Sequence, residues 1–242
     1  MKLNVSRYLI GSGAVVAAIL LGVGGAYGYR LTAGSRLMIR DYMRTHSVRK
    51  LQIGAGGTNL SGWLNSDVEP VPGEAYLDAT KTFPIPDSSL SYIFSEDVVE
   101  HLSYSEGLFM LRESYRTLKP GGRVRIATPN LLKLVRLFTD PKTDDTRSYI
   151  QNKVAVDNWP ETASPECIII NFEMHSYGHK FVYDPVTLRQ SLELAGFQSI
   201  TEFAPGESSD PQLAGLEVRH SQKVKLHSMH DYETMVLEAV RP

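Results

Sequence analysis

The fold is decided by the stretch Leu51-Gln-Ile-Gly-Ala-Gly-Gly57, in which a short apolar strand ends on closely spaced glycines. Glycines suit such a turn because the backbone must bend sharply and approach a ligand with no Cβ in the way. An acidic residue, Asp67, closes the next apolar stretch, and a carboxylate there can bind both hydroxyls of a ribose. The pattern predicts an α/β sheet that holds a nucleoside, although an ordinary strand-to-loop turn has the same short signature.

The dinucleotide-binding fingerprint is incomplete in this stretch. It requires G-x-G-x-x-G, but Asn59 stands where the third glycine belongs. Asp67 follows Gly54 by 13 positions, whereas a full βαβ unit separates the two by about 20. No lysine of a phosphate-binding P-loop follows the glycines either. These departures weaken the prediction of NAD and indicate that the first helix is short or absent.

Length, composition and charge limit which classes of protein this chain can belong to. The chain has 242 residues, 42% of them hydrophobic and 21% charged, which is typical of one globular domain with an appendage. The net charge is −2 and the isoelectric point is near 6.4, so we expect no nucleic-acid partner. The single cysteine, Cys167, excludes an intrachain disulfide.

The N-terminus carries an uncharged run. Tyr8 to Tyr29 spans 22 positions without a charge, and a helix of that length reaches about 33 Å, enough to cross a bilayer. More basic residues follow the run than precede it, and this bias places the rest of the chain in the cytoplasm. A cleaved signal peptide, with Ala26 and Gly28 at the cleavage site, is the alternative. We therefore expect a single-pass membrane protein with an anchor over residues 1–30, a basic connector over 31–49 and a cytoplasmic domain over 50–242.

Beyond the connector, predicted strands alternate with predicted helices. The sequence predicts strands at residues 51–53, 63–68, 75–77, 90–95, 123–128 and 234–240. A capping box at Ser103 and Glu106 opens one helix, and Asp184-Pro185 opens another that ends at Gly196. This alternation predicts a doubly wound, mostly parallel Rossmann-like sheet.

Ligands of such sheets bind beyond the carboxyl ends of the strands. Here these ends carry glycine or a carboxylate, at Gly54 to Gly57, Asp67, Asp78, and Glu96-Asp97 followed by Glu100-His101. Any one carboxylate could cap a helix. Four consecutive strand ends of this kind, however, predict a binding site along one edge of the sheet.

Five motifs, in this order, resemble class I S-adenosylmethionine-dependent methyltransferases of the type 11 kind. They are Leu51-Gln-Ile-Gly-Ala-Gly56, Gly62-Trp-Leu-Asn-Ser-Asp67, Phe83-Pro-Ile-Pro-Asp87, Val99-Glu-His-Leu102 and Leu118-Lys-Pro-Gly-Gly122. The pair Gly62-Trp63 before the aspartate resembles a small subgroup associated with bacterial surface polysaccharide synthesis. The resemblance is close from about residue 50 to residue 131 and implies an α/β methyltransferase fold with S-adenosylmethionine as cofactor.

The resemblance also implies which residues contact the cofactor. They are Gly54, Ala55, Gly56, Asp67, Val68, Asp78, Ala79, Glu96 and Asp97. On this basis the turn glycines accommodate the methionine part, Asp67 the ribose, Asp78 with Ala79 the adenine, and the pair after the fourth strand the methyl-donor side. Many relatives carry histidine at the position of Asp97, which leaves the identity of a catalytic base open.

Methyl transfer from a sulfonium depends mainly on positioning, and a base is needed only if the acceptor is a hydroxyl. His101 is the first candidate for this base and Asp97 the second, while a structural role for His101 stays open. His175 and His179 have the i, i+4 spacing of a metal-binding pair, but Gly178 argues against a regular helix between them. We therefore expect a substrate loop there and no metal.

The resemblance and the predicted anchor indicate an enzyme that methylates a hydroxyl of a sugar or a lipid-linked saccharide at the cytoplasmic membrane face. Methylation of a quinone or another membrane lipid is the alternative reaction. A catalytically degenerate domain that acts as a scaffold is the non-enzyme alternative. The expected partners are a small-molecule, saccharide or lipid-linked acceptor and, through the N-terminal helix, the membrane.

Overall fold

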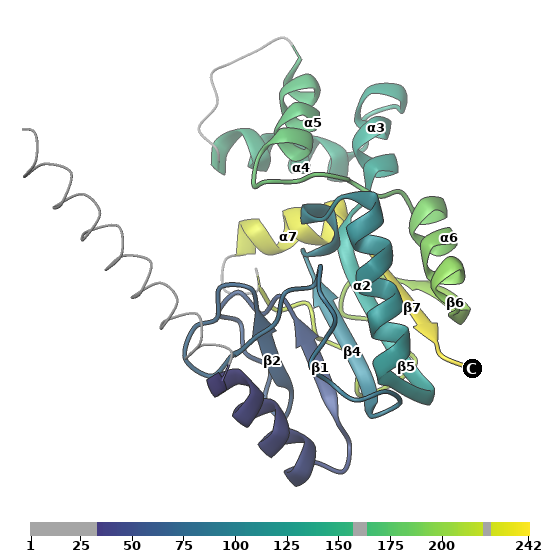
Figure 1. Ribbon diagram of the computed structural model, residues 1–242. Helices are drawn as coiled ribbons and strands as arrows, with labels where there is room; N and C mark the ends of the chain where they lie inside the picture. The colour runs from purple at the N-terminus through teal and green to yellow at the C-terminus, as the bar shows by residue number, and fades with distance from the viewer. Residues whose placement is uncertain (1–32, 157–163, 220–223) are drawn as a thin grey trace, which may run out of the picture.

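The computed structural model describes residues 33–156, 164–219 and 224–242, and a mixed β-sheet lies at their centre (Figure 1). Its strands are β1 (Lys50–Ile53), β2 (Leu64–Asp67), β3 (Ala75–Tyr76), β4 (Leu90–Glu96), β5 (Leu118–Pro129), β6 (Gln198–Phe203) and β7 (Thr234–Val240). Their order across the sheet is β3-β2-β1-β4-β5-β7-β6. Strands β1 to β5 pair in parallel, whereas β7 runs antiparallel to both β5 and β6. The order reverses between β1 and β4, and such a reversal is where α/β sheets bind ligands.

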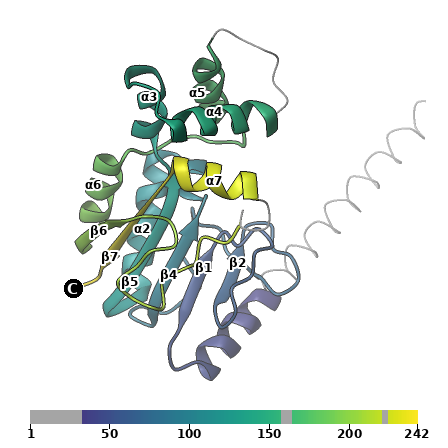
Figure 2. The same ribbon diagram turned by 180° about the vertical axis from the view of Figure 1, so that it is seen from behind.

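Helices cover the sheet and extend beyond one of its edges. They are η1 (Val99–His101), α2 (Tyr104–Thr117), α3 (Leu131–Thr139), α4 (Asp144–Val156), α5 (Pro165–His175), α6 (Pro185–Ala195) and α7 (Val224–Glu233). In Figure 1, α2 and α6 lie against one face of the sheet, and α3, α4, α5 and α7 gather beyond the carboxyl edge. Seen from behind, the loop of residues 204–219 crosses the opposite face (Figure 2). The prediction of a Rossmann-like α/β sheet is confirmed.

Two predicted helices begin and end as their sequence signals require. Ser103 and Glu106 form a capping box, because the N–H of Ser103 donates to Glu106 Oε2 at 2.8 Å and the N–H of Glu106 donates to Ser103 Oγ at 3.4 Å. At the start of α6, the side chain of Asp184 accepts from the N–H of Thr187 at 2.7 Å. Gly196 ends α6 with a φ of +106°, a left-handed conformation that costs glycine little because it has no Cβ.

Side chains on the two faces of the sheet form separate cores. Neighbouring residues of a strand point to opposite faces, and Ile93 and Phe94 of β4 divide in this way. Ile93 packs in the larger core with Leu111 of α2 and Leu188 of α6. Phe94 packs on the other side in a cluster with Leu213 from the 204–219 loop. Packed side chains therefore support the sheet on both faces, next to the carboxyl edge that carries the predicted site.

Residues 33–45 fall in the predicted connector and are helical. Ile39 and Tyr42 of this helix are buried in the larger core. The Tyr42 hydroxyl donates to the carbonyl of Gly62 at 3.0 Å and accepts from the N–H of Lys50 at 2.9 Å. This helix thus packs against the sheet, while the division of the chain at residues 30 and 49 stays a prediction.

The predicted single-pass membrane localisation requires correction. Among the described residues, no helix combines the length and the apolar character that a membrane span needs. The longest of them, α2, has 14 residues and reaches about 21 Å, short of the roughly 30 Å of a bilayer core. The run from Tyr8 to Tyr29, on which the prediction of an anchor rested, lies outside the described residues.

Candidate active site

The predicted glycine turn follows β1 at the carboxyl edge of the sheet. Gly54, Gly56 and Gly57 have φ values of +70°, +54° and +83°, in the left-handed region that glycine adopts readily. The N–H of Gly56 donates to Asp67 Oδ2 at 2.9 Å, and the N–H of Gly57 donates to Glu74 Oε1 at 2.9 Å. The structure therefore brings the predicted cofactor residues that follow β1 and end β2 together at one point.

Gly54 lies too close to its neighbour to carry a side chain, and at Gly56 a side chain would displace the end of Arg219 and meet an unfavourable φ of +54°. A Cβ at Gly54 would lie 2.2 Å from Val98 Cγ2, and a Cβ at Gly56 would lie 2.8 Å from Arg219 Nη1. Ala55, between them, is completely buried. The turn thus presents backbone rather than side chains at the position where the resemblance implies the methionine part of the cofactor.

Asp67 keeps acceptor capacity beyond the turn that it holds. Its Oδ2 accepts from Gly56, and its Oδ1 accepts from the N–H of Glu69 at 2.8 Å. An ionised carboxylate has about four lone-pair sites. Two sites therefore remain, which fits two ribose hydroxyls.

The predicted adenine residues lie further along the same edge. Asp78 follows β3, and its Oδ1 accepts from the N–H of Thr80 at 2.9 Å. Ala79 beside it is buried, whereas Val68, after β2, is 56% exposed. Hydrogen bonding from Leu77 N–H to the carbonyl of Asp67, at 2.9 Å, joins the two strand ends. These residues continue the edge that starts at the glycine turn.

A cavity of about 380 Å³, lined mainly by residues of polar types, opens beyond the ends of β4, β5 and β7. Its lining residues are Asp97, Glu100, His101, Pro129, Lys153, Glu173, Tyr177, His179, Arg219, Met229, His230, Glu233 and Thr234. The two predicted catalytic residues, His101 and Asp97, are among them. The residues of the glycine turn are not, so the cavity lies beside the predicted cofactor position rather than on it.

Arg219 connects the glycine turn with this cavity. Its Nη2 donates to the carbonyl of Gly54 at 2.5 Å and to the carbonyl of Glu96 at 3.1 Å. Its Nε lies 4.0 Å from Asp97 Oδ2. The guanidinium of Arg219 therefore lies at the boundary between the glycine turn and the cavity, the two halves of the candidate site.

Glu96 and Asp97 follow one another at the end of β4. Glu96 is buried, and its pKa is raised to about 7 because burial disfavours the charged form and Asp97 adds a like charge. Asp97 has a φ of +51°, an uncommon conformation for a residue other than glycine. His230 Nε2 lies 3.5 Å from Glu96 Oε1 and 3.7 Å from Asp97 Oδ2. Burial lowers the pKa of His230, but the hydrogen bond and charge of Asp97 outweigh this effect and raise it overall.

We expect Glu96→Gln to become more stable relative to the unmodified protein as pH rises from 5 to 8. In the unfolded chain Glu96 loses its proton near its ordinary pKa of 4.5, whereas the folded chain holds the proton up to about 7. Rising pH therefore removes stability in this window, by on the order of 3 kcal/mol, and glutamine removes the titration. Urea unfolding of both proteins at several pH values measures the difference, and a difference that stays constant with pH contradicts the assignment.

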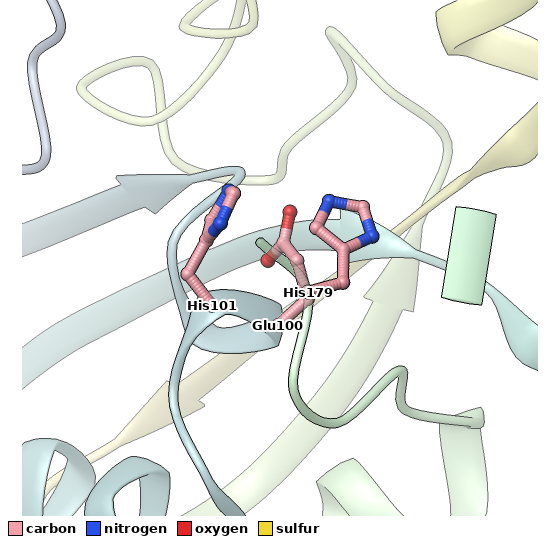
Figure 3. A group of neighbouring side chains, drawn as sticks. All are labelled: Glu100, His101 and His179. Carbon is pink, nitrogen blue, oxygen red and sulfur yellow. The ribbon is translucent and has the colours of Figure 1, made fainter. Parts of the chain in front are cut away.

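Glu100, His101 and His179 form a second group on the cavity wall (Figure 3). Glu100 is completely buried and accepts from Thr128 Oγ1 at 2.9 Å. Burial, and secondarily the charge of Asp97, raises the pKa of Glu100 to about 8. The imidazole centroids of His101 and His179 are 4.9 Å apart, and burial is the largest cause that lowers the pKa of each. Both rings are therefore neutral near pH 7.

The sequence did not single out several residues of this cavity. The spacing of His175 and His179 suggests a pair, but His175 is exposed at the end of α5, and the chain turns at Tyr177 and Gly178 with φ values of +56° and +79°. His179 consequently faces His101 instead. His230 and Arg219 carried no local signal at all, because their contacts join segments far apart in the sequence.

Residues 63–126 match the family model of the methyltransferase domain, whereas no curated protein matches the chain. A methyltransferase of Archaeoglobus fulgidus, described as SAM-dependent, is 17% identical over 85% of this chain and 92% of that chain, with a TM-score of 0.45. The S-adenosylmethionine-dependent methyltransferase of Mesorhizobium loti is 15% identical over 80% of this chain and 91% of that chain, with a TM-score of 0.46. Phosphoethanolamine N-methyltransferase 2 of Haemonchus contortus is 17% identical over 86% of this chain but only 52% of that chain, with a TM-score of 0.40.

The family match and the sheet together define the class of the protein. The matched residues run from the start of β2 into β5 and include the end of β4, which borders the cavity. The chain is an enzyme, an S-adenosylmethionine-dependent methyltransferase, and its cofactor is S-adenosylmethionine. The predictions of enzyme class and cofactor are thereby confirmed.

Proposed function

We propose that this methyltransferase acts on a hydroxyl of a small-molecule acceptor, a sugar or a lipid-linked saccharide. The observation that supports the proposal is the set of polar side chains that line the cavity of about 380 Å³ beside the glycine turn. Its carboxylates, imidazoles, ammonium and guanidinium groups donate and accept hydrogen bonds, as a polyhydroxylated ligand requires. The pair Gly62-Trp63 resembles the subgroup associated with bacterial surface polysaccharide synthesis, and this also supports a saccharide acceptor.

The glycine turn is the proposed position of the methionine part of the cofactor. S-adenosylmethionine, when bound, supplies a methyl group that its sulfonium already activates. Gly54 and Gly56 give it a backbone surface, and Asp67 offers the acceptor sites for the ribose. Asp78 and Ala79 are the proposed adenine contacts. Glu96 and Asp97 complete this proposed set on the side of the cavity.

A hydroxyl acceptor must lose its proton as the new bond to carbon forms. His101 lines the cavity, and because burial lowers its pKa, its imidazole is neutral near pH 7 and able to accept a proton. Asp97 lines the same cavity and is the second candidate. We therefore assign the activation of the hydroxyl to His101 first and to Asp97 second.

We expect Asp67→Ala to weaken S-adenosylmethionine binding about 10- to 150-fold, the equivalent of roughly 1.5–3 kcal/mol for lost charge-assisted hydrogen bonds. Asp67→Asn keeps an acceptor for Gly56 and should lose less. Isothermal titration of the full chain measures the affinity, with the exposed Asp145→Ala on α4 as the control. An Asp67→Ala protein that binds as tightly as the unmodified chain removes the ribose assignment.

The proposed acceptor class is tested by a panel of acceptors with radiolabelled S-adenosylmethionine. The panel contains free sugars, lipid-linked saccharides, quinols and small amines. We expect label in the saccharides. Label confined to quinols supports the alternative reaction, and label confined to amines contradicts a hydroxyl acceptor altogether.

A further inference from the structure

Three ligating side chains converge on one wall of the cavity. Glu100 and His101 belong to η1, and His179 lies beyond α5. One carboxylate oxygen and one nitrogen from each histidine all lie within 4.8 Å of one another. In Figure 3 the carboxylate of Glu100 lies between the two imidazole rings. The sequence predicts no metal at His175 and His179, and Glu100, His101 and His179 come together only in the folded chain.

Both imidazoles are oriented by the backbone. The Nδ1 of His179 lies 2.6 Å from the carbonyl of Glu173, and because a carbonyl only accepts, Nδ1 carries the proton and Nε2 keeps its lone pair. Figure 3 shows one nitrogen of His179 turned toward Glu100 and the other turned away. His101 makes its own hydrogen bond with the backbone of Tyr177. Histidines that ligate metals are oriented in this way by a partner of the second ring nitrogen.

The carboxylate of Glu100 provides a second, independent observation. The residue has no exposed surface, and although one oxygen accepts from Thr128, Oε1 has no hydrogen-bond partner within the part of the chain that the structure describes. Leaving a buried carboxylate oxygen unsatisfied costs free energy. A cation bound beside it would displace the proton that Glu100 holds near pH 7 and would supply the missing interaction.

We propose that Glu100, His101 and His179 bind a divalent first-row transition metal ion, and that Zn²⁺ fits this donor set. Two imidazole nitrogens and one carboxylate oxygen are a common three-ligand set, which leaves one coordination position open. Ligand atoms around Zn²⁺ lie about 3.3 Å apart, given bonds of about 2.0–2.1 Å, so binding requires a small inward rotation of the side chains. The open position faces the cavity, because all three residues line it.

The consequence for catalysis rests on the proposed function. A metal ion at this point would lower the pKa of an acceptor hydroxyl in the cavity. His101 would then contribute to the activation of that hydroxyl as a ligand, and Asp97, which lines the same cavity, would take the proton. Metal binding, in contrast, can be measured without a methyl donor or an acceptor.

The test is titration of the chelator-treated full chain with Zn²⁺ in a calorimeter, followed by titration with Co²⁺ in a visible spectrometer. We expect one equivalent of Zn²⁺ and a cobalt absorption band typical of low coordination number. Glu100→Gln and His179→Gln should each weaken Zn²⁺ binding at least 100-fold, since changes in residues that only support ligands already cost about 10- to 100-fold. His175→Ala, an exposed histidine at the end of α5, is the matched control and should bind as the unmodified chain does.

Melting curves recorded in chelator separate loss of a ligand from loss of the fold. His179→Gln keeps the backbone turn at Gly178 and serves where Glu100→Gln does not fold. Stoichiometric binding that both variants leave unchanged, or an unmodified chain that binds no Zn²⁺, overturns the site. Neither result changes what the acceptor panel is expected to show. Failure of the metal site and failure of the proposed function are therefore distinguishable.

Discussion

His101→Ala should lower turnover about 10²- to 10⁴-fold while the affinity for S-adenosylmethionine stays within about twofold of the unmodified protein. His101 lines the acceptor cavity, whereas the glycine turn and Asp67 lie outside it. The loss is expected whether His101 takes the proton directly or holds a metal ion that activates the hydroxyl. Initial rates with a saccharide acceptor, together with calorimetric titration of the cofactor, measure both quantities.

The pH dependence of the rate provides an independent check on His101. A base must be unprotonated, and burial lowers the pKa of His101 below 6.5. The rate should therefore be level above that value and fall as the solution becomes more acid than the lowered pKa. His175→Ala should keep the rate and the profile. A His101→Ala protein with a reduced melting temperature but an unchanged rate per folded molecule shows that His101 is structural.

Arg125→Met should destabilise the protein by about 3–5 kcal/mol, the usual cost of removing one partner from a buried ion pair. Arg125 is completely buried and donates to both oxygens of Glu217, at 2.7 and 2.8 Å, and to Glu238 at 2.6 Å. Burial lowers the pKa of Arg125, but its bonds to these carboxylates raise it overall, so the side chain is charged. Methionine keeps much of the volume and leaves two buried carboxylates without their cation.

Arg123→Met is the matched control for this substitution. Arg123 lies on the same strand, but its pair with Asp210 is 3.5 Å long and its side chain is 37% exposed. Its loss should cost less than about 1 kcal/mol. Urea unfolding measures both changes, and adding Glu217→Gln and Glu238→Gln to Arg125→Met should recover much of the stability. Equal effects of Arg123→Met and Arg125→Met contradict the importance of the buried network.

The buried ion pairs of Arg125 with Glu217 and Glu238 also affect the candidate active site. Glu217 accepts from Arg125 and lies two positions before Arg219, which donates to the carbonyls of Gly54 and Glu96. Arg125 thereby anchors the loop that carries Arg219 to the glycine turn. A weaker affinity for S-adenosylmethionine should accompany the loss of stability in Arg125→Met.

Sequence signals that act over a few residues predicted their structures well. The strand that ends on Gly54, the capping box at Ser103 and the stop at Gly196 all depend on near neighbours, and each appears in the structure. β6 was not predicted, because it is the outer strand beside β7 and most of its side chains are exposed, so that no apolar alternation marks it. β5 begins at Leu118 rather than at Arg123, and the register shift between Leu90 and Tyr92 accommodates this extension.

The candidate site could be predicted only in part. Glu100 and His101 stand next to each other in a recognisable motif, but His179 follows His101 by 78 positions and meets it only because α5 ends and the chain turns back. Lys153 and Glu173 come from two further helices and meet in a buried ion pair. No short pattern encodes such contacts, since they depend on how α4, α5 and α7 pack above the sheet.

The most direct test of the proposed function is the chemical bond that the transferred methyl group forms. The full chain is incubated with S-adenosylmethionine carrying a ¹³C-labelled methyl group and with the polar fraction of a cell extract, and the products are examined by carbon–proton correlation NMR. We predict one new signal of a methyl ether on a sugar ring, which His101→Ala greatly reduces. A labelled methyl group on nitrogen or on carbon, formed at a rate that His101→Ala does not change, would contradict the account.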